Sequence, residues 1–144
     1  MKTATSLPQE VFLSHSSRNR PFVVKLAETL RRHHIPVWYS ETNLVGAQQW
    51  HDEIGQALRR CDWFVIVLSP SSVTSEWVKR ELQFALQDRR YRNRILPVLY
   101  KPCDVIELSW TLPSMQRVDF VKNFEAGCRE LFRVWGIGFK PASP

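Results

Sequence analysis

The sequence contains no long apolar run and no recognisable secretion signal. None of its apolar stretches approaches the roughly 18 to 20 residues that are needed to span a bilayer. The first residues, MKTATSLPQEVF, lack the apolar segment of a secretory signal. We therefore expect a cytoplasmic protein without a membrane partner.

Internal repeats, low-complexity tracts and long linkers are also missing. A chain of 144 residues with 44% hydrophobic and 24% charged residues is long enough to bury one real core. We expect a single domain over residues 1–144, with its core at about 11–135.

Cysteine is scarce and poorly placed for either disulfides or metal binding. Cys61, Cys103 and Cys128 are odd in number and widely spaced, and they form no CxxC pair. The four histidines add no ligand partner at a useful spacing, and two of them, His33 and His34, are adjacent. These patterns predict reduced thiols and no metal site.

Basic residues outnumber acidic ones, which gives a net charge of +6 and a pI near 9.6. The densest basic segment is RRYRNR at 89–94, where a helix is expected to end. Cations in a last helical turn complement the helix dipole, so a solvated turn explains this segment at least as well as a nucleic-acid site does. Nucleic acid is therefore not the expected partner.

Short apolar strands alternate with amphipathic helices. Strands are expected at 11–14, 36–39, 64–68, 95–100 and 117–120, and Pro97 predicts incomplete hydrogen bonding in the fourth. Helices are expected at about 21–33, 50–61, 75–86 and 124–135. This alternation predicts an α/β protein with a parallel sheet, right-handed crossovers and helices on both faces.

One residue conflicts with the pattern of the helix SEWVKRELQFAL at 75–86. At about 100° per residue, one broad side of this helix is apolar. Its members are Trp77, Val78, Leu82, Phe84, Ala85 and Leu86. Glu81 projects inside the same arc, although a carboxylate is almost never buried without compensation. Either Glu81 has a function, or its carboxylate reaches outward to solvent, Lys79 or Arg80.

Polar segments follow the first three expected strands. They are Ser14–Ser17, Ser40–Gln49 and Ser69–Ser72. Ligands of open α/β sheets bind outside the carboxyl ends of the strands. A site is therefore predicted at this edge of the sheet, and Glu81 lies close to it in the following helix.

Four stretches carry a resemblance to a known family. They are VFLSHSS at 11–17, VWYSETNLVGA at 37–47, DWFVIVLSPSS at 62–72 and SEWVKREL at 75–82. In this order and spacing the chain resembles the TIR domain family, named after Toll and interleukin receptors, and especially its bacterial members. The resemblance covers about 11–120 and implies a flavodoxin-like three-layer fold, whose five-stranded parallel sheet has the order 2-1-3-4-5.

The resemblance also implies an activity, because one branch of this family cleaves the nicotinamide–ribose bond of NAD+. Its essential glutamate comes four places after a tryptophan, a pattern met by Trp77 and Glu81, with Ser75 two places before the tryptophan. We expect Glu81 to be catalytic. NAD+ would be the substrate and no separate cofactor is expected. The products would be nicotinamide and either ADP-ribose or a cyclic isomer of it.

Further residues are candidates for contact with the substrate. They are Trp77, Ser14, His15, Arg18, Trp38, Tyr39 and Ser75. Several of them have a plainer interpretation as well. The aromatic residues are often core residues, and Ser75 suits a helix N-cap.

Enzymes of this branch usually self-associate and act in cell-death or antiviral defence. The loop Ser40–Gln49 is then expected to help assembly, through Glu41, Asn43, Leu44, Val45 and Gly46. A separate sensor or effector protein is a further possible partner. The alternative is a non-catalytic adaptor that docks through the same loop and the segment Arg89–Arg94.

Overall fold

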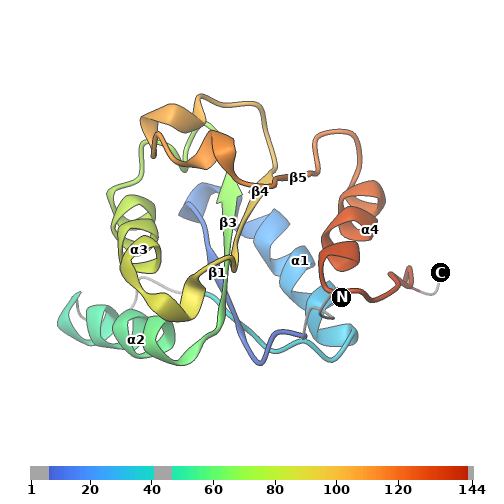
Figure 1. Cartoon of the computed structure of the whole chain (residues 1–144), viewed down its shortest axis with the longest axis horizontal. Coiled ribbons are helices and arrows are strands. Elements are labelled where there is room, and N and C mark those ends of the chain that lie inside the picture. Colours follow the sequence, from blue (N-terminus) through green and yellow to red (C-terminus); the bar gives the residue numbers. More distant parts are fainter. Residues whose placement is uncertain (1–6, 41–46, 143–144) are drawn as a thin grey trace.

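The computed structural model describes residues 7–40 and 47–142, which form three layers around a parallel sheet (Figure 1). The strands are β1 (Val11–Ser14), β2 (Val37–Trp38), β3 (Trp63–Leu68), β4 (Ile95–Leu99) and β5 (Val118–Asp119). Their order is β2-β1-β3-β4-β5, and every neighbouring pair is parallel. The predicted flavodoxin-like α/β fold is confirmed.

Four α-helices cover the two faces of the sheet. They are α1 (Arg20–Arg32), α2 (Ala47–Arg60), α3 (Glu76–Gln87) and α4 (Phe124–Val134). Figure 1 shows α2 and α3 on one side of the sheet and α1 and α4 on the other. All four predicted helices are present, with ends within a few residues of the expected positions.

Alternation along β1 divides the buried side chains into two cores. Val11 and Leu13 pack toward α1 and α4, whereas Phe12 packs toward α2 and α3. The central strand β3 is buried on both faces, and all six of its residues are buried. Its unbroken apolar run, WFVIVL, is therefore that of a parallel strand covered on both faces.

The proline in β4 lies where the ladder does not need its missing N–H. The Phe64 N–H donates to the Arg94 carbonyl at 2.9 Å, so even-numbered residues of β4 turn toward β3. The Phe120 N–H donates to the Leu99 carbonyl at 2.8 Å, so odd-numbered residues turn toward β5. Pro97 thus faces the β5 side, where pairing begins only at Val98. The predicted gap in hydrogen bonding falls on that side of the strand.

Two details of the sequence interpretation were wrong. Phe84 and Leu86 were placed on the apolar side of α3, but they are 36% and 38% exposed. They lie at the margins of the arc, where the helix surface has already turned away from the sheet. The arginine-rich segment is not a last turn of α3, since a separate 3-10 turn, η2 (Arg89–Tyr91), follows that helix. Tyr91 is fully buried there and donates a hydrogen bond to the Leu58 carbonyl.

Cys61 and Cys128 are buried, Cys103 is half-buried, and none of the three is in a disulfide. Within the described ranges, no helix is both long and apolar enough to cross a membrane.

Candidate active site

Glu81 lies in the second turn of α3 and is buried against the end of β1. The helix begins after Ser75, whose hydroxyl oxygen accepts a hydrogen bond from the Val78 N–H at 3.3 Å. Only 7% of Glu81 is exposed, and its Oε1 accepts a hydrogen bond of 2.7 Å from the Ser14 hydroxyl. Among the described residues no lysine or arginine pairs with this carboxylate. The outward-reaching alternative is therefore wrong.

Burial dominates the proton affinity of this carboxyl group. Loss of hydration raises the pKa of Glu81 to about 7, and the hydrogen bond from Ser14 opposes that rise. Near neutral pH the group is therefore present in both protonation states. A carboxyl group with this behaviour, at the ligand-binding edge of an open α/β sheet, is a candidate for catalysis.

Strand alternation separates the predicted site residues into two groups. Ser14 and Trp38 turn toward α2 and α3 and so share the side of Glu81. Tyr39 turns toward α1, and the His15 ring lies beside it with centroids 6.0 Å apart. The predicted contacts thus flank the edge of the sheet from both faces and do not form one cluster.

Two tryptophans border the Glu81 side. Trp77, one turn earlier on α3, is half-buried, with the Arg80 guanidinium carbon 5.5 Å from its ring centroid. Trp38 is also half-buried and stacks on Phe12, with centroids 5.1 Å apart. Both pack at the margin of the core formed with α2 and α3. Each could offer an aromatic surface to a flat ligand ring.

The pKa of His15 lies below its ordinary value of 6.5, which favours the neutral ring at neutral pH. Burial is the main cause that lowers its pKa, a hydrogen bond to the Leu13 carbonyl acts in the opposite direction, and the charge of Arg20 lowers it further. Nδ1 lies 3.3 Å from the Leu13 oxygen, and a carbonyl can only accept, so Nδ1 carries the proton. Nε2 is then an acceptor, which suits a hydroxyl group better than a phosphate.

Arg20 is a further candidate for the site, which the sequence interpretation did not include. It is half-buried in the first turn of α1, its charge is felt by His15, and its Nη2 donates to the Ser40 carbonyl at 3.4 Å. It therefore links the segments that follow β1 and β2. The sequence did contain a signal for Arg20, because it lies in the polar segment between the first expected strand and the first expected helix.

The structure gives other predicted residues different surroundings. Arg18 is exposed in the 3-10 turn η1 (Ser17–Asn19), where its backbone N–H donates to the Ser16 hydroxyl at 3.3 Å. Ser75 caps α3, in line with the plainer of its two interpretations. The predicted assembly residues Glu41, Asn43, Leu44, Val45 and Gly46 lie outside the described residues.

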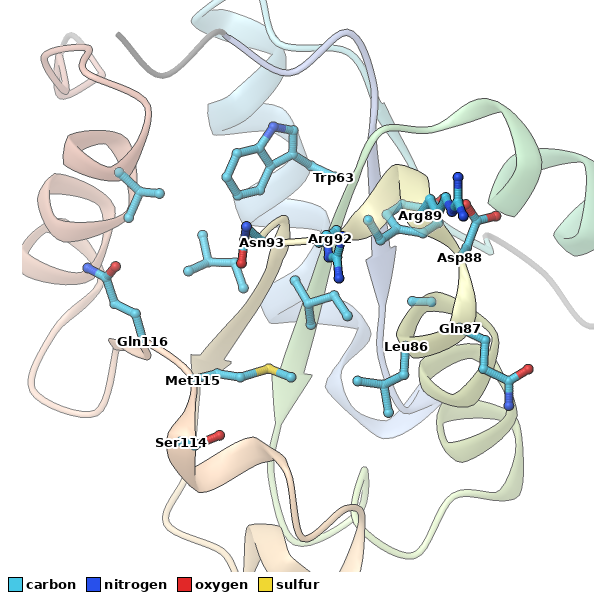
Figure 2. Close-up of a pocket in the computed structure, with 15 residues that line it drawn as sticks. Trp63, Leu86, Gln87, Asp88, Arg89, Arg92, Asn93, Ser114, Met115 and Gln116 are labelled. Carbon is cyan, nitrogen blue, oxygen red and sulfur yellow. The ribbon is translucent and has the colours of Figure 1, made fainter. Parts of the chain in front are cut away.

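A cavity of about 1040 Å³ lies elsewhere, beside the start of β4 (Figure 2). The Met115 and Leu86 side chains extend toward each other across it, and Arg89 and Arg92 belong to its lining. None of the predicted site residues lines it. No three histidine, cysteine, aspartate or glutamate side chains gather as a metal site in the described ranges.

The sheet order and the carboxylate at its edge define a flavodoxin-like α/β protein with a candidate active site after the first and third strands. The model of the TIR domain family matches residues 11–132, and the chain belongs to that family.

Similar curated proteins include enzymes that act on NAD+ or make cyclic ADP-ribose. One is the 2' cyclic ADP-D-ribose synthase BtTIR of Bacteroides thetaiotaomicron, 30% identical over 94 residues, or 64% of this chain and 33% of the relative. Another is the NAD(+) hydrolase PdTIR of Paracoccus denitrificans, 32% identical over 96 residues, or 65% of this chain and 32% of the relative. The chain thus spans about a third of the length of the curated relatives it matches.

Solved structures of low identity share the fold. The TIR domain of the Toll-related receptor TRR-2 from Hydra magnipapillata has a TM-score of 0.68 at 23% identity, covering 87% of this chain and 96% of that one. A TIR-STING receptor from C. gigas has a TM-score of 0.70 at 18% identity, covering 98% of this chain and 42% of that one.

Proposed function

We propose that this TIR domain cleaves the nicotinamide–ribose bond of NAD+, with Glu81 as its catalytic residue. The observation that carries the proposal is a buried carboxylate, held by Ser14 and bordered by Trp77, at the ligand-binding edge of the sheet. Family membership supports it, as do the activities in the names of the relatives. No separate cofactor takes part.

One carboxylate is sufficient for this reaction. Most glycosidases need a second carboxyl group, because an alcohol leaving group must be protonated. Nicotinamide departs from NAD+ as a neutral ring, since the bond breaks at a pyridinium nitrogen that is already cationic. The remaining task is to stabilise the positive charge that develops on the ribose. A preorganised carboxylate of low hydration is suited to that task.

Different residues around Glu81 would bind different parts of the substrate. Trp77 and Trp38 offer aromatic surfaces on the side of Glu81, where the nicotinamide ring must lie if its ribose is to reach the carboxylate. Neutral His15 can accept a hydrogen bond from a ribose hydroxyl, and the charge of Arg20 favours a phosphate. Arg18 and Tyr39 would contact the substrate at the margin of the site. Ser75 would act indirectly, because it caps the start of α3 and so helps to place Glu81.

Two products are compatible with this chemistry. Water gives ADP-ribose when it attacks the ribosyl cation, whereas a nucleophile of the bound substrate gives a cyclic isomer. The second outcome needs a folded substrate and a site that excludes water.

Product analysis tests the proposal and separates these outcomes. Purified protein is incubated with NAD+ and the products are separated by chromatography, beside Glu81→Gln and the control Glu53→Gln. Glu53 is an exposed residue of α2. Activity should disappear in the first variant and persist in the second. If both variants retain it, Glu81 is not the catalytic residue.

We further propose that the protein acts in the cytoplasm, in cell-death or antiviral defence, and is activated by self-association. The segment that contains Glu41, Asn43, Leu44, Val45 and Gly46 would join neighbouring copies. A related fold occurs in the TIR domains of the activated Roq1 resistosome, which shares 19% sequence identity with this chain. A separate sensor or effector protein would supply the signal.

The alternative function is that of a non-catalytic adaptor, and one observation favours it. Arg89 and Arg92 line a cavity beside the part of β4 that β5 leaves unpaired, which is a suitable place for a protein contact. This account predicts no turnover at any concentration. It also predicts that Arg89→Glu with Arg92→Glu lowers association in sedimentation experiments.

A further inference from the structure

We propose that Ser14 is a positioning residue, whose hydroxyl holds Oε1 of Glu81 and so fixes the orientation of the carboxylate toward the substrate. This inference rests on the proposed function and changes the role expected of Ser14 from the sequence. A hydroxyl that already donates its hydrogen to a carboxylate has no hydrogen left for a substrate oxygen or a leaving group. Ser14 therefore acts through Glu81 and not on NAD+ itself.

The donor is held rigidly. Ser14 is the last residue of β1 and pairs with Ile66 of the central strand β3. Only 1% of Ser14 is exposed, so its side chain is enclosed by protein and shielded from water. The distance of 2.7 Å is that of a well-formed O–H···O hydrogen bond. This contact thus fixes the carboxylate before the substrate arrives.

The same hydrogen bond opposes the effect of burial on the pKa of Glu81. Loss of hydration raises the pKa of Glu81, and the Ser14 hydroxyl is the described group that acts against it. Charged groups on neighbouring elements have other partners. The Arg80 guanidinium on α3 lies over the Trp77 ring, and His51 on α2 lies 6.2 Å from that ring. His15, beyond the end of β1, lies with Tyr39 on the opposite side of the sheet.

Ser14→Ala should therefore change the pH dependence of turnover. Without the hydrogen bond, the midpoint of the acidic limb should rise by about one pH unit, which is a loss of about tenfold in rate on that limb. At high pH most of the rate should return. The loss should appear in kcat, with KM for NAD+ nearly unchanged, because the hydroxyl does not touch the substrate.

A matched control separates this role from simple loss of a buried hydroxyl. Thr29 on α1 is also buried, and its hydroxyl donates to the Lys25 carbonyl at 2.9 Å on the far face of the sheet. Thr29→Val should leave the pH profile unchanged. Ser14→Thr keeps the hydroxyl and should restore the profile of the unmodified protein.

A second measurement tests the role of Ser14 and does not require the protein to turn over NAD+. The carboxyl carbon of Glu81 is followed by NMR during a pH titration, and its signal is assigned by its absence in Glu81→Gln. The titration midpoint should be higher in Ser14→Ala than in the unmodified protein. Coincident midpoints would overturn the role of Ser14, even if NAD+ is cleaved. A shifted midpoint without any release of nicotinamide would support the contact and refute the proposed function.

Discussion

The Ser69 hydroxyl donates a hydrogen bond of 2.7 Å to the Asn19 side-chain oxygen, and both residues are buried. This contact joins the turn after β1 to the turn after β3, although the two residues are 50 positions apart. His15 precedes Asn19, and Arg20 follows it. The Ser71 hydroxyl donates to the same Asn19 oxygen at 3.4 Å, so Asn19 joins the two segments that flank the candidate site.

Asn19→Ala should weaken both the fold and the site. The buried Ser69 hydroxyl would lose this acceptor, at a cost of about 1 to 2 kcal/mol in the free energy of unfolding. KM for NAD+ should rise several-fold, because His15 and Arg20 are no longer held. Urea denaturation and steady-state kinetics measure the two effects.

Asn123 provides the control for that variant. Its side-chain oxygen accepts from the Ala126 N–H at 2.8 Å and caps α4, the helix that follows β5. Asn123→Ala should cost about 1 kcal/mol and leave KM unchanged. An equal change of KM in both variants would show that Asn19 acts only through stability.

Replacement of two helical glycines by alanine should change the stability of the protein in opposite directions. A Cβ at Gly127 of α4 would lie 2.3 Å from the Phe120 ring, which is itself buried, so Gly127→Ala should cost about 2 to 4 kcal/mol. A Cβ at Gly55 of α2 would meet only the end of the Arg59 side chain, at 3.7 Å. Gly55→Ala should therefore stabilise the protein by about 0.5 to 1 kcal/mol. Thermal unfolding of the two variants measures both changes, and a stabilised Gly127→Ala would contradict the close approach.

Glu81 should make the protein less stable as the pH rises. Burial raises its pKa from 4.5 to about 7 in the folded state, so between these values the unfolded chain loses a proton that the folded chain keeps. The free energy of unfolding then falls with rising pH. Glu81→Gln removes this effect and should be more stable at pH 8 by about 1 to 3 kcal/mol. The difference should vanish below pH 4.5, as measured by urea denaturation across the range.

The exposed Glu53 supplies the reference for that experiment. Glu53→Gln changes the net charge by the same amount as Glu81→Gln, but it removes no buried carboxylate. Its stability relative to the unmodified protein should not depend on pH to a comparable degree. A parallel pH dependence in both variants would mean that net charge, and not burial, is the cause.

Turnover per molecule should rise steeply with protein concentration if neighbouring copies complete the site. Substitution of Leu44 and Val45 by aspartate should remove this rise, because a charged side chain is costly to bury in a contact between copies. The measurement is the initial rate over a wide dilution series. A constant rate per molecule would contradict activation by self-association.

The sequence was a good guide to α3 and to its buried glutamate. Helical spacing placed Glu81 between Trp77 and Ala85, and the structure buries it there. The same spacing was less accurate for Phe84 and Leu86, because periodicity gives an angle but not the width of the surface that a sheet can cover. The strand order followed from family resemblance, since alternation alone predicts only a parallel sheet.

The contacts within the site could not be predicted in the same way. The partner of Ser14 depends on which helix covers its face of the sheet, and local spacing does not reveal that. Once α3 is known to lie there, alternation explains why Ser14 reaches Glu81 and why the His15 ring lies beside Tyr39 on the other face. Arg20 was missed because its contact with Ser40 joins segments that are distant in the sequence.

The most direct test of this account is the release of nicotinamide from NAD+ at high protein concentration, with Glu81→Ala measured beside the unmodified protein. We expect release by the unmodified protein and none by the variant, while circular dichroism shows that the variant remains folded. Equal release by both proteins would contradict the role of Glu81. No release by either protein, even when the copies are forced to cluster, would contradict the enzymatic function and favour an adaptor.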